Sequence, residues 1–121
     1  MEWLHVITPA IPEAELRARC TLARLPALCA DVHEVDAVGD AERGEISCVW
    51  GLFDARCTAV RNGVRYELLS CPNALQWTVT TRNGETTLHA SINVARGDPE
   101  FIESIATFLA NFRHGLEQGR A

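Results

Sequence analysis

The sequence predicts an α+β fold, in which an antiparallel sheet of six to seven strands packs on a long C-terminal helix. Two Arg-Asn-Gly tripeptides, at 61–63 and 82–84, each lie between strand-like runs. Asn-Gly readily takes the positive φ values of a tight type I′ turn, so each tripeptide predicts a β-hairpin. An apolar stripe with helical spacing follows the second hairpin and predicts the long helix. At 121 residues, the chain has the length of a single domain with its own core.

The first thirty residues predict a short strand followed by one or two short helices. Trp3 to Ile7 alternates weakly between apolar and polar side chains, as a strand does. Pro12, followed closely by two glutamates, is typical of the first turn of a helix. Pro26 is expected to end this helix, and a further helical turn is expected over Ala27–Ala30.

The middle of the chain predicts strands. Val32–Val38 and Ile46–Phe53 are strand-like, and a polar connection over Gly39–Gly44 lies between them. The first hairpin is expected to pair Arg61 with Val64, which decides the side chains that share a face. Its buried face would then carry Cys57, Ala59, Val64, Tyr66 and Leu68.

The second hairpin separates its apolar and polar faces more sharply. Its buried face is expected to carry Leu75, Trp77, Val79, Leu88, Ala90, Ile92 and Val94. Asp98-Pro99-Glu100 then combines an N-cap acceptor, a first-turn proline and an acid, so it predicts a helix start. This helix is expected to run from Pro99 to Leu116, with Gly115 ending or fraying it. Its apolar side carries Phe101, Ile102, Ile105, Phe108, Leu109 and Phe112.

Charge excludes several classes of function. The net charge is −5, and the eleven basic residues are single, scattered arginines, so no nucleic-acid partner is expected. The chain has no lysine. Schiff-base enzymes and nucleotidases with a phosphate-loop lysine are therefore excluded.

Cysteine usage and hydropathy predict a cytoplasmic protein without a membrane partner. No apolar run reaches the ~18 residues that a membrane-spanning helix needs. The N-terminus does not show the pattern of a secretory signal. The five cysteines are odd in number and form no Cys-x-x-Cys motif. They are expected to be free, buried thiols.

Motifs for catalysis or metal binding are missing from the sequence. The nearest approach to a zinc pattern is Cys29-x3-His33, which lacks the second pair of ligands. None of the serines has the sequence surroundings of a known nucleophile. We therefore expect no catalytic residue, no metal and no cofactor.

This order of elements resembles the helix-grip fold of the START-like superfamily, which includes pollen allergens, polyketide cyclases and steroidogenic lipid-transfer domains. One matching piece is the proline-punctuated segment Ile11 to Ala30, which leads into Asp31-Val32-His33-Glu34-Val35. The others are the hairpin Asn73 to Val94 and the helix Pro99 to Leu116. The match covers nearly the whole chain at the level of layout and includes no catalytic motif.

The resemblance implies a sheet that curves around the long helix and leaves a cavity between the two layers. The candidate ligand-binding residues are Trp50, Tyr66, Leu68, Trp77, Leu88, Phe101, Ile105, Phe108 and Phe112. The same residues would form an ordinary core in any protein with this pattern, since a small domain has little interior to spare. Both interpretations stay open at the level of sequence.

Three functions follow as hypotheses. The first is non-catalytic binding of a small hydrophobic ligand, with a polyketide-cyclase-like enzyme as its catalytic variant. That variant needs a polar group, such as Tyr66 or a histidine, facing the cavity. The second is a protein-interaction or assembly module without a ligand, which includes a homodimer. The third is redox or metal sensing through the thiols.

Overall fold

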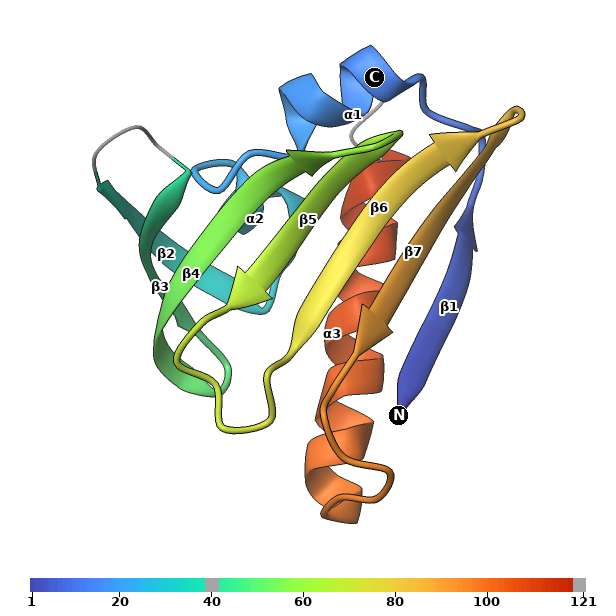
Figure 1. The fold of residues 1–121 in the computed structure, drawn as a ribbon. Helices are drawn as coiled ribbons and strands as arrows, with labels where there is room; N and C mark the ends of the chain where they lie inside the picture. The colour runs from blue at the N-terminus through green and yellow to red at the C-terminus, as the bar shows by residue number, and fades with distance from the viewer. Residues whose placement is uncertain (39–41, 119–121) are drawn as a thin grey trace.

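The structure, a computed structural model, describes residues 1–38 and 42–118 and forms one seven-stranded antiparallel sheet with three helices. The strand order is β1-β7-β6-β5-β4-β3-β2 (Figure 1). The first strand, β1, is therefore an edge strand that pairs with the last strand, β7. The elements in chain order are β1 (Glu2–Ile7), α1 (Glu13–Arg19), α2 (Leu25–Leu28), β2 (Val32–Val38), β3 (Arg43–Cys48), β4 (Gly51–Val60), β5 (Gly63–Leu68), β6 (Gln76–Arg82), β7 (Glu85–Ser91) and α3 (Pro99–Gln118).

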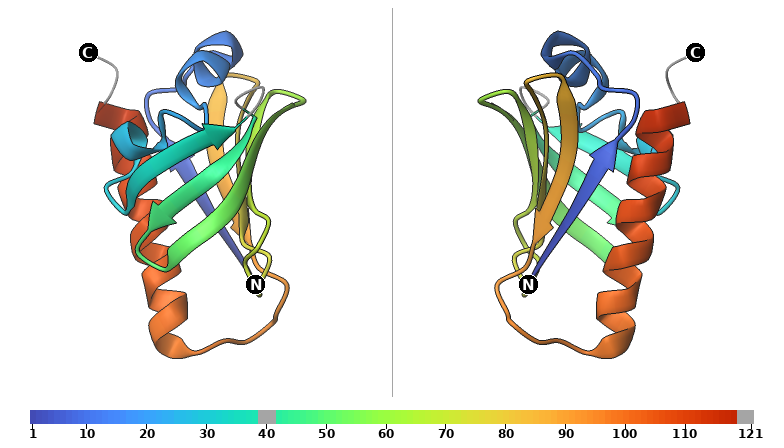
Figure 2. Two further views of the ribbon diagram at one scale, coloured as in Figure 1. Left: turned by 90° about the vertical axis from the view of Figure 1, so that its left-hand side faces the viewer. Right: turned by 90° about the vertical axis from the view of Figure 1, so that its right-hand side faces the viewer.

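The sheet curves, and the long helix α3 lies along its concave face (Figure 2). α1 covers the end of that face near the β4–β5 and β6–β7 turns, and α2 packs against β2 and α3 (Figure 1). The predicted α+β class, with a curved sheet of seven strands on a C-terminal helix, is confirmed. None of the helices in the described part of the chain is long and apolar enough to cross a membrane.

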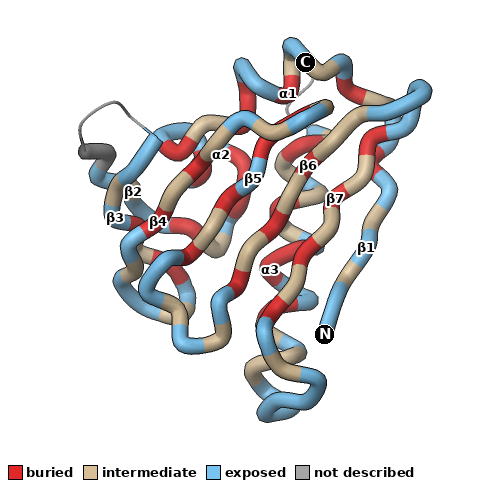
Figure 3. Tube along the Cα trace, in the orientation of Figure 1, coloured by how far each residue is buried: buried red, intermediate tan, exposed pale blue. Residues whose placement is uncertain are grey.

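Burial follows the predicted faces of the second hairpin. Trp77, Val79 and Leu88 are at most 1% exposed, while the alternate residues of the same strands face outward (Figure 3). The register pairs Trp77 with Ala90 and Val79 with Leu88. Because side chains alternate along a strand, this pairing puts one continuous apolar surface under α3.

The two Asn-Gly sequences serve different purposes. At the second turn both Asn83 and Gly84 have positive φ, as a type I′ turn requires. At the first turn only Asn62 has positive φ, and Gly63 already belongs to β5. A Cβ on Gly63 would approach the carbonyl oxygen of Val79 to 1.9 Å. The first glycine is therefore needed because β6 passes close to it.

The predicted register of the first hairpin is wrong by one residue on each strand. Val60 pairs with Gly63 and Ala59 with Val64, so Arg61 lies in the turn itself. A shift of one residue on each strand keeps every side chain on its predicted face. Tyr66 and Leu68 are accordingly buried, although Ala59 on the same face is exposed near the turn.

The predicted single strand Ile46–Phe53 is wrong. The chain reverses at Val49-Trp50, and β3 pairs with β4 through Cys48 and Gly51. Gly51 has a φ of 117°, which allows a reversal that the apolar alternation does not reveal. β3 also begins at Arg43, inside the predicted polar connection, of which residues 39–41 lie outside the described residues.

Two predictions for the helices also need correction. Pro26 does not end the first helix, because α1 ends at Arg19 and Pro26 lies in the first turn of α2. The further helical turn therefore begins at Leu25 and ends at Leu28. Gly115 does not end α3, which continues to Gln118. A Cβ on Gly115 would lie 1.7 Å from the carbonyl oxygen of Leu28, so glycine lets α2 approach α3.

Candidate functional site

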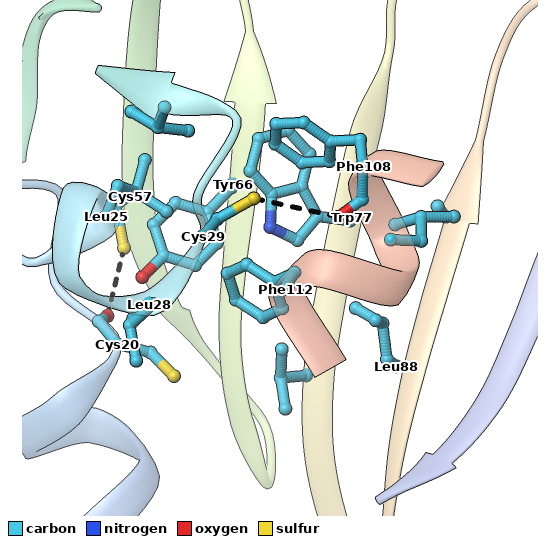
Figure 4. Close-up of a cluster of buried hydrophobic side chains, with 14 of the residues drawn as sticks. Cys20, Leu25, Leu28, Cys29, Cys57, Tyr66, Trp77, Leu88, Phe108 and Phe112 are labelled. Atoms are coloured by element: carbon cyan, nitrogen blue, oxygen red, sulfur yellow. Dashed lines mark hydrogen bonds between the residues drawn. The ribbon is translucent and has the colours of Figure 1, made fainter. Parts of the chain in front are cut away.

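An aromatic cluster fills the space between the sheet and α3. It consists of Trp50, Tyr66, Trp77, Phe101, Phe108 and Phe112. Tyr66 stacks on Trp77 with ring centroids 5.2 Å apart, and Phe108 meets Trp77 edge-on at 5.0 Å (Figure 4). Trp50 lies 4.9 Å from Phe108 at the rim. Such offset and edge-to-face pairs are the favoured arrangements of aromatic rings.

All nine candidate ligand-binding residues lie in this core or against it. Six form the aromatic cluster, and the other three, Leu68, Leu88 and Ile105, are at most 3% exposed. In this structure the rings are in contact with one another. A ligand between the layers would have to occupy space that these side chains fill, so their role as ligand contacts stays a prediction.

The two tryptophans of the cluster differ in how their indole N–H groups are satisfied. Trp50 Nε1 donates a hydrogen bond to Ser104 Oγ at 2.8 Å. Trp77 is 1% exposed, and its Nε1 has no hydrogen-bond partner. Among the described residues it is the one buried side-chain nitrogen or oxygen in this condition. Native interiors contain few such groups, because each forfeits the hydrogen bond that it made with water.

A pocket of about 260 Å³ opens where the end of α1 faces β4 and β5. We call it the Cys20–Cys57 pocket; its lining residues are Arg17, Cys20, Thr21, Leu22, Glu42, Cys57, Thr58, Ala59 and Val64. The two thiols, Leu22 and Val64 make much of this wall apolar. The pocket lies on the concave side of the sheet, because Cys57 and Val64 share a face with Tyr66.

Tyr66, a member of the aromatic cluster, lies beside this pocket. Its Cα pairs across the strands with Cys57, and its ring stacks on Trp77. Its hydroxyl donates a hydrogen bond to the carbonyl oxygen of Thr21 at 3.0 Å. Cys57 Sγ donates in the same way to the carbonyl oxygen of Cys20 at 3.3 Å (Figure 4). These two bonds attach the segment between α1 and α2 to the sheet.

Burial determines the acidity of Cys20, Cys57 and Tyr66, which lie at the seam where the segment between α1 and α2 meets the sheet. It raises the pKa of the Cys20 thiol to about 12 and that of the Cys57 thiol to about 11. The pKa of the Tyr66 hydroxyl is raised well above its usual value for the same reason, with the nearby thiols adding to the effect. All three groups are therefore neutral near pH 7 and act as hydrogen-bond donors, the thiols weakly, rather than as nucleophiles.

The remaining polar side chains do not gather into a site of another kind. All four histidines lie in the described part of the chain, and none of them is buried. Within residues 1–38 and 42–118, no three metal-ligating side chains come together. A second hollow of about 320 Å³ is lined by Asp31, Val49, Glu100, Glu103, Ser104 and Thr107, and its three carboxyl groups do not suit an apolar molecule.

Sequence reasoning missed the Cys20–Cys57 pocket. Its walls come from the end of α1 and from two strands about forty residues further along the chain. The alternation of β4 and β5 correctly put Cys57 and Val64 on the concave face. The position of α1 over them depends on contacts such as Arg17 Nη2 to the carbonyl oxygen of Val60, 2.8 Å, which no local pattern encodes.

A curved antiparallel sheet that holds one long helix, with a pocket at its open end, defines the helix-grip class of α+β domains. The chain has a START-like fold, which its likeness to solved structures supports. A START superfamily protein from Mycobacterium smegmatis matches with a TM-score of 0.58 and 11% identity, over 97% of this chain and 93% of that one.

Two proteins from Bacillus species have a similar fold. XoxI from Bacillus cereus matches with a TM-score of 0.64 and 12% identity, over 98% of this chain and 93% of that one. A putative uncharacterized protein from Bacillus thuringiensis matches with a TM-score of 0.62 and 12% identity, over 94% and 96% of the two chains. No protein-family model matches the sequence, and neither does any curated protein.

Proposed function

We propose that this protein binds a small hydrophobic molecule between the sheet and α3, with access through the Cys20–Cys57 pocket. The observation that carries the proposal is the position of this pocket next to Tyr66, whose ring stacks on Trp77 in the aromatic cluster. A volume of about 260 Å³ is slightly below the ~300–1,000 Å³ of typical ligand pockets. A ligand larger than the pocket would extend past Tyr66 into the cluster.

The segment beside the pocket is held to the sheet by a few side-chain hydrogen bonds and by its buried side chains, among them Cys20 and Leu22, each 1% exposed. Residues 20–24, between α1 and α2, form no regular element. The side chains of Tyr66, Cys57 and Arg17 supply hydrogen bonds between this region and the sheet. Segments with few bonds of this kind open at lower free energy than the strands beneath them. Displacement of Tyr66 would let a ligand replace ring contacts within the cluster with its own.

Native mass spectrometry of the protein as purified is the direct test. A retained apolar molecule would appear as added mass that organic solvent removes. A titration with the uncharged fluorophore N-phenyl-naphthylamine then locates the site. In Ala59→Trp the new side chain fills the mouth of the pocket without overfilling the core, because Ala59 is exposed. We expect this change to weaken binding by about tenfold, or ~1.4 kcal/mol.

Thr78→Trp is the matched control, because Thr78 lies on the outer face of β6. It adds the same side chain to the sheet away from the pocket and should leave the affinity unchanged. Equal affinities in both variants would show that the fluorophore binds elsewhere. The absence of both fluorophore binding and retained mass would contradict the proposed function.

A second candidate function is protein interaction through the edge strand β1. Leu4 is 67% exposed and Val6 is 41% exposed, and both lie on the outward face of that strand. Exposed apolar side chains on an edge strand are a common route to pairing with another chain. Light scattering during size-exclusion chromatography tests the homodimer. If it forms through β1, Leu4→Lys should return it to the monomer, while Leu52→Lys, at another exposed leucine, should not.

The catalytic variant of the first proposal would depend on Tyr66. Its hydroxyl lies at the boundary between the pocket and the cluster, where it bonds to Thr21. Because burial keeps the phenol neutral, Tyr66 would act as a hydrogen-bond donor to a substrate oxygen. Cyclisation of a polyketone that is lost in Tyr66→Phe, with binding retained, would support this variant.

A further inference from the structure

The unpartnered indole N–H of Trp77 lies at the centre of the proposed ligand site. Tyr66 stacks on the indole, Phe108 meets it edge-on, and Phe112 lies 6.1 Å away. The indole N–H of Trp77 donates no hydrogen bond to any of these residues. The Tyr66 hydroxyl, the polar group of these rings, donates to the carbonyl oxygen of Thr21 and does not accept from Trp77.

Other buried polar groups of the described chain are also bonded to other partners. The thiol of Cys29 donates to the carbonyl oxygen of Phe108 at 3.6 Å. Arg19 is the one buried charged side chain among the described residues, and it donates to the carbonyl oxygen of Leu116 at 2.8 Å and pairs with Glu15. Around Trp77, the described residues therefore offer one buried hydrogen-bond donor without a partner and no buried cation that lacks one.

A buried water does not explain this arrangement well. An ordered interior water is usually held by about three hydrogen bonds, and here Trp77 would supply a single donor among aromatic rings. A ligand oxygen has the opposite requirements. One good hydrogen bond satisfies a carbonyl oxygen, while the apolar remainder of the molecule replaces ring contacts.

We propose that Trp77 Nε1 donates a hydrogen bond to a neutral acceptor oxygen, such as a ketone carbonyl, on an otherwise apolar ligand. This inference rests on the proposed function and specifies its ligand class. An anionic ligand such as a fatty-acid carboxylate is disfavoured, because its charge would be buried beside the aromatic rings without a free cation.

Fluorenone and fluorene provide a matched pair of probes, since they have nearly the same shape and differ by a ketone oxygen. We expect fluorenone to bind the unmodified protein about tenfold more tightly, because it pairs a donor that fluorene leaves unsatisfied. In Trp77→Phe the ring remains aromatic but the donor is gone, so the two probes should bind equally. Trp3→Phe removes an indole that lies outside the aromatic cluster and the nine candidate residues, and should keep the preference for fluorenone.

Nuclear magnetic resonance of the unmodified protein gives a second readout that needs no variant to fold. The chain has three tryptophans, so three indole N–H resonances are expected. The Trp77 resonance should move downfield when fluorenone binds and stay near its position when fluorene binds. Equal affinities with an unmoved Trp77 resonance would overturn the inference and leave the proposed function standing. If neither probe binds, this inference fails, while the proposed function is decided by the retained mass and the binding of N-phenyl-naphthylamine.

Discussion

The hydroxyl of Tyr66 on β5 donates a hydrogen bond to the backbone carbonyl of Thr21, 3.0 Å away, at the start of the segment that joins α1 to α2. This bond links two parts of the chain that are 45 residues apart. The ring of the same tyrosine stacks on Trp77 in the core. One side chain thereby joins the sheet, the covering segment and the aromatic cluster.

Tyr66→Phe should destabilise the protein modestly while it keeps the ring stack. The change removes the donor to Thr21 and leaves a carbonyl without this partner, so we expect a loss of about 1–2 kcal/mol in the free energy of unfolding. Urea denaturation measures it. Unchanged stability would mean that the bond contributes nothing and that the seam is already open in solution.

Titration of Tyr66 should coincide with alkaline unfolding. It is the only tyrosine in the chain, and burial raises its pKa well above the usual value. The unfolded chain ionises its tyrosine at a pKa of ~10, below the raised pKa of the folded state. The free energy of unfolding therefore falls as the pH rises above ~10. Near-ultraviolet absorbance of tyrosinate should therefore rise together with the loss of circular dichroism. Ionisation of the intact fold near pH 10 would contradict the burial of the hydroxyl.

Thiol labelling under native conditions should distinguish Cys71 from the other four cysteines. Cys71 is partly exposed, whereas Cys20, Cys29, Cys48 and Cys57 are buried. Burial also raises the pKa of these four thiols, to about 12 for Cys20 and Cys29, so little thiolate is present at pH 8. Ellman's reagent should give one fast equivalent, and Cys71→Ser should abolish it. Several fast thiols would instead favour the redox-sensing hypothesis.

Gly115→Ala should destabilise the protein, although alanine favours a helix. Helix propensity alone would add about 1 kcal/mol of stability. The new Cβ, however, would lie 1.7 Å from the Leu28 carbonyl oxygen and would push α2 away from α3. We expect a net loss of about 1–3 kcal/mol in thermal or urea unfolding. Ala110→Gly, at an exposed position of the same helix, calibrates the propensity effect. A stabilised Gly115→Ala would show that α2 does not approach α3 this closely.

Phe108→Ala should cost more than Phe101→Ala. Phe108 is 1% exposed and contacts both Trp50 and Trp77, whereas Phe101 is only partly buried at the rim. Emptying the central position should lower the free energy of unfolding by about 3–5 kcal/mol. Equilibrium denaturation of the two variants compares them directly. Equal costs would mean that the centre of the cluster is no better packed than its rim.

Much of the fold could be predicted because its signals are local. Asn83-Gly84 sets the tight turn of the second hairpin, and the alternation around it puts Trp77 and Leu88 on one face. The start of α3 at Pro99 follows from its capping residues. The reversal at Gly51 escaped prediction, because its positive φ belongs to a glycine without a neighbouring Asn signal.

The candidate site likewise has features that the sequence predicts and features that it does not. Eight of the nine candidate residues could be placed on inward faces, since a face depends only on parity along a strand or on helical spacing. Trp50 is the exception, because it lies in the turn between β3 and β4 and not in the predicted strand. Their ring contacts could not be predicted, because each contact joins separate elements. The burial of Arg19 is a similar case: its guanidinium reaches the carbonyl oxygen of Leu116, 97 residues further along the chain.

The sequence by itself determined the α+β class, the order of the elements and the faces that became the core. These properties follow from turn chemistry and from the periods of strands and helices, which act over a few residues. Only the tertiary structure decided that α1 leaves a pocket beside Tyr66 and that Trp77 Nε1 is buried without a partner. Both depend on how distant segments approach one another in space, and packing sets that approach.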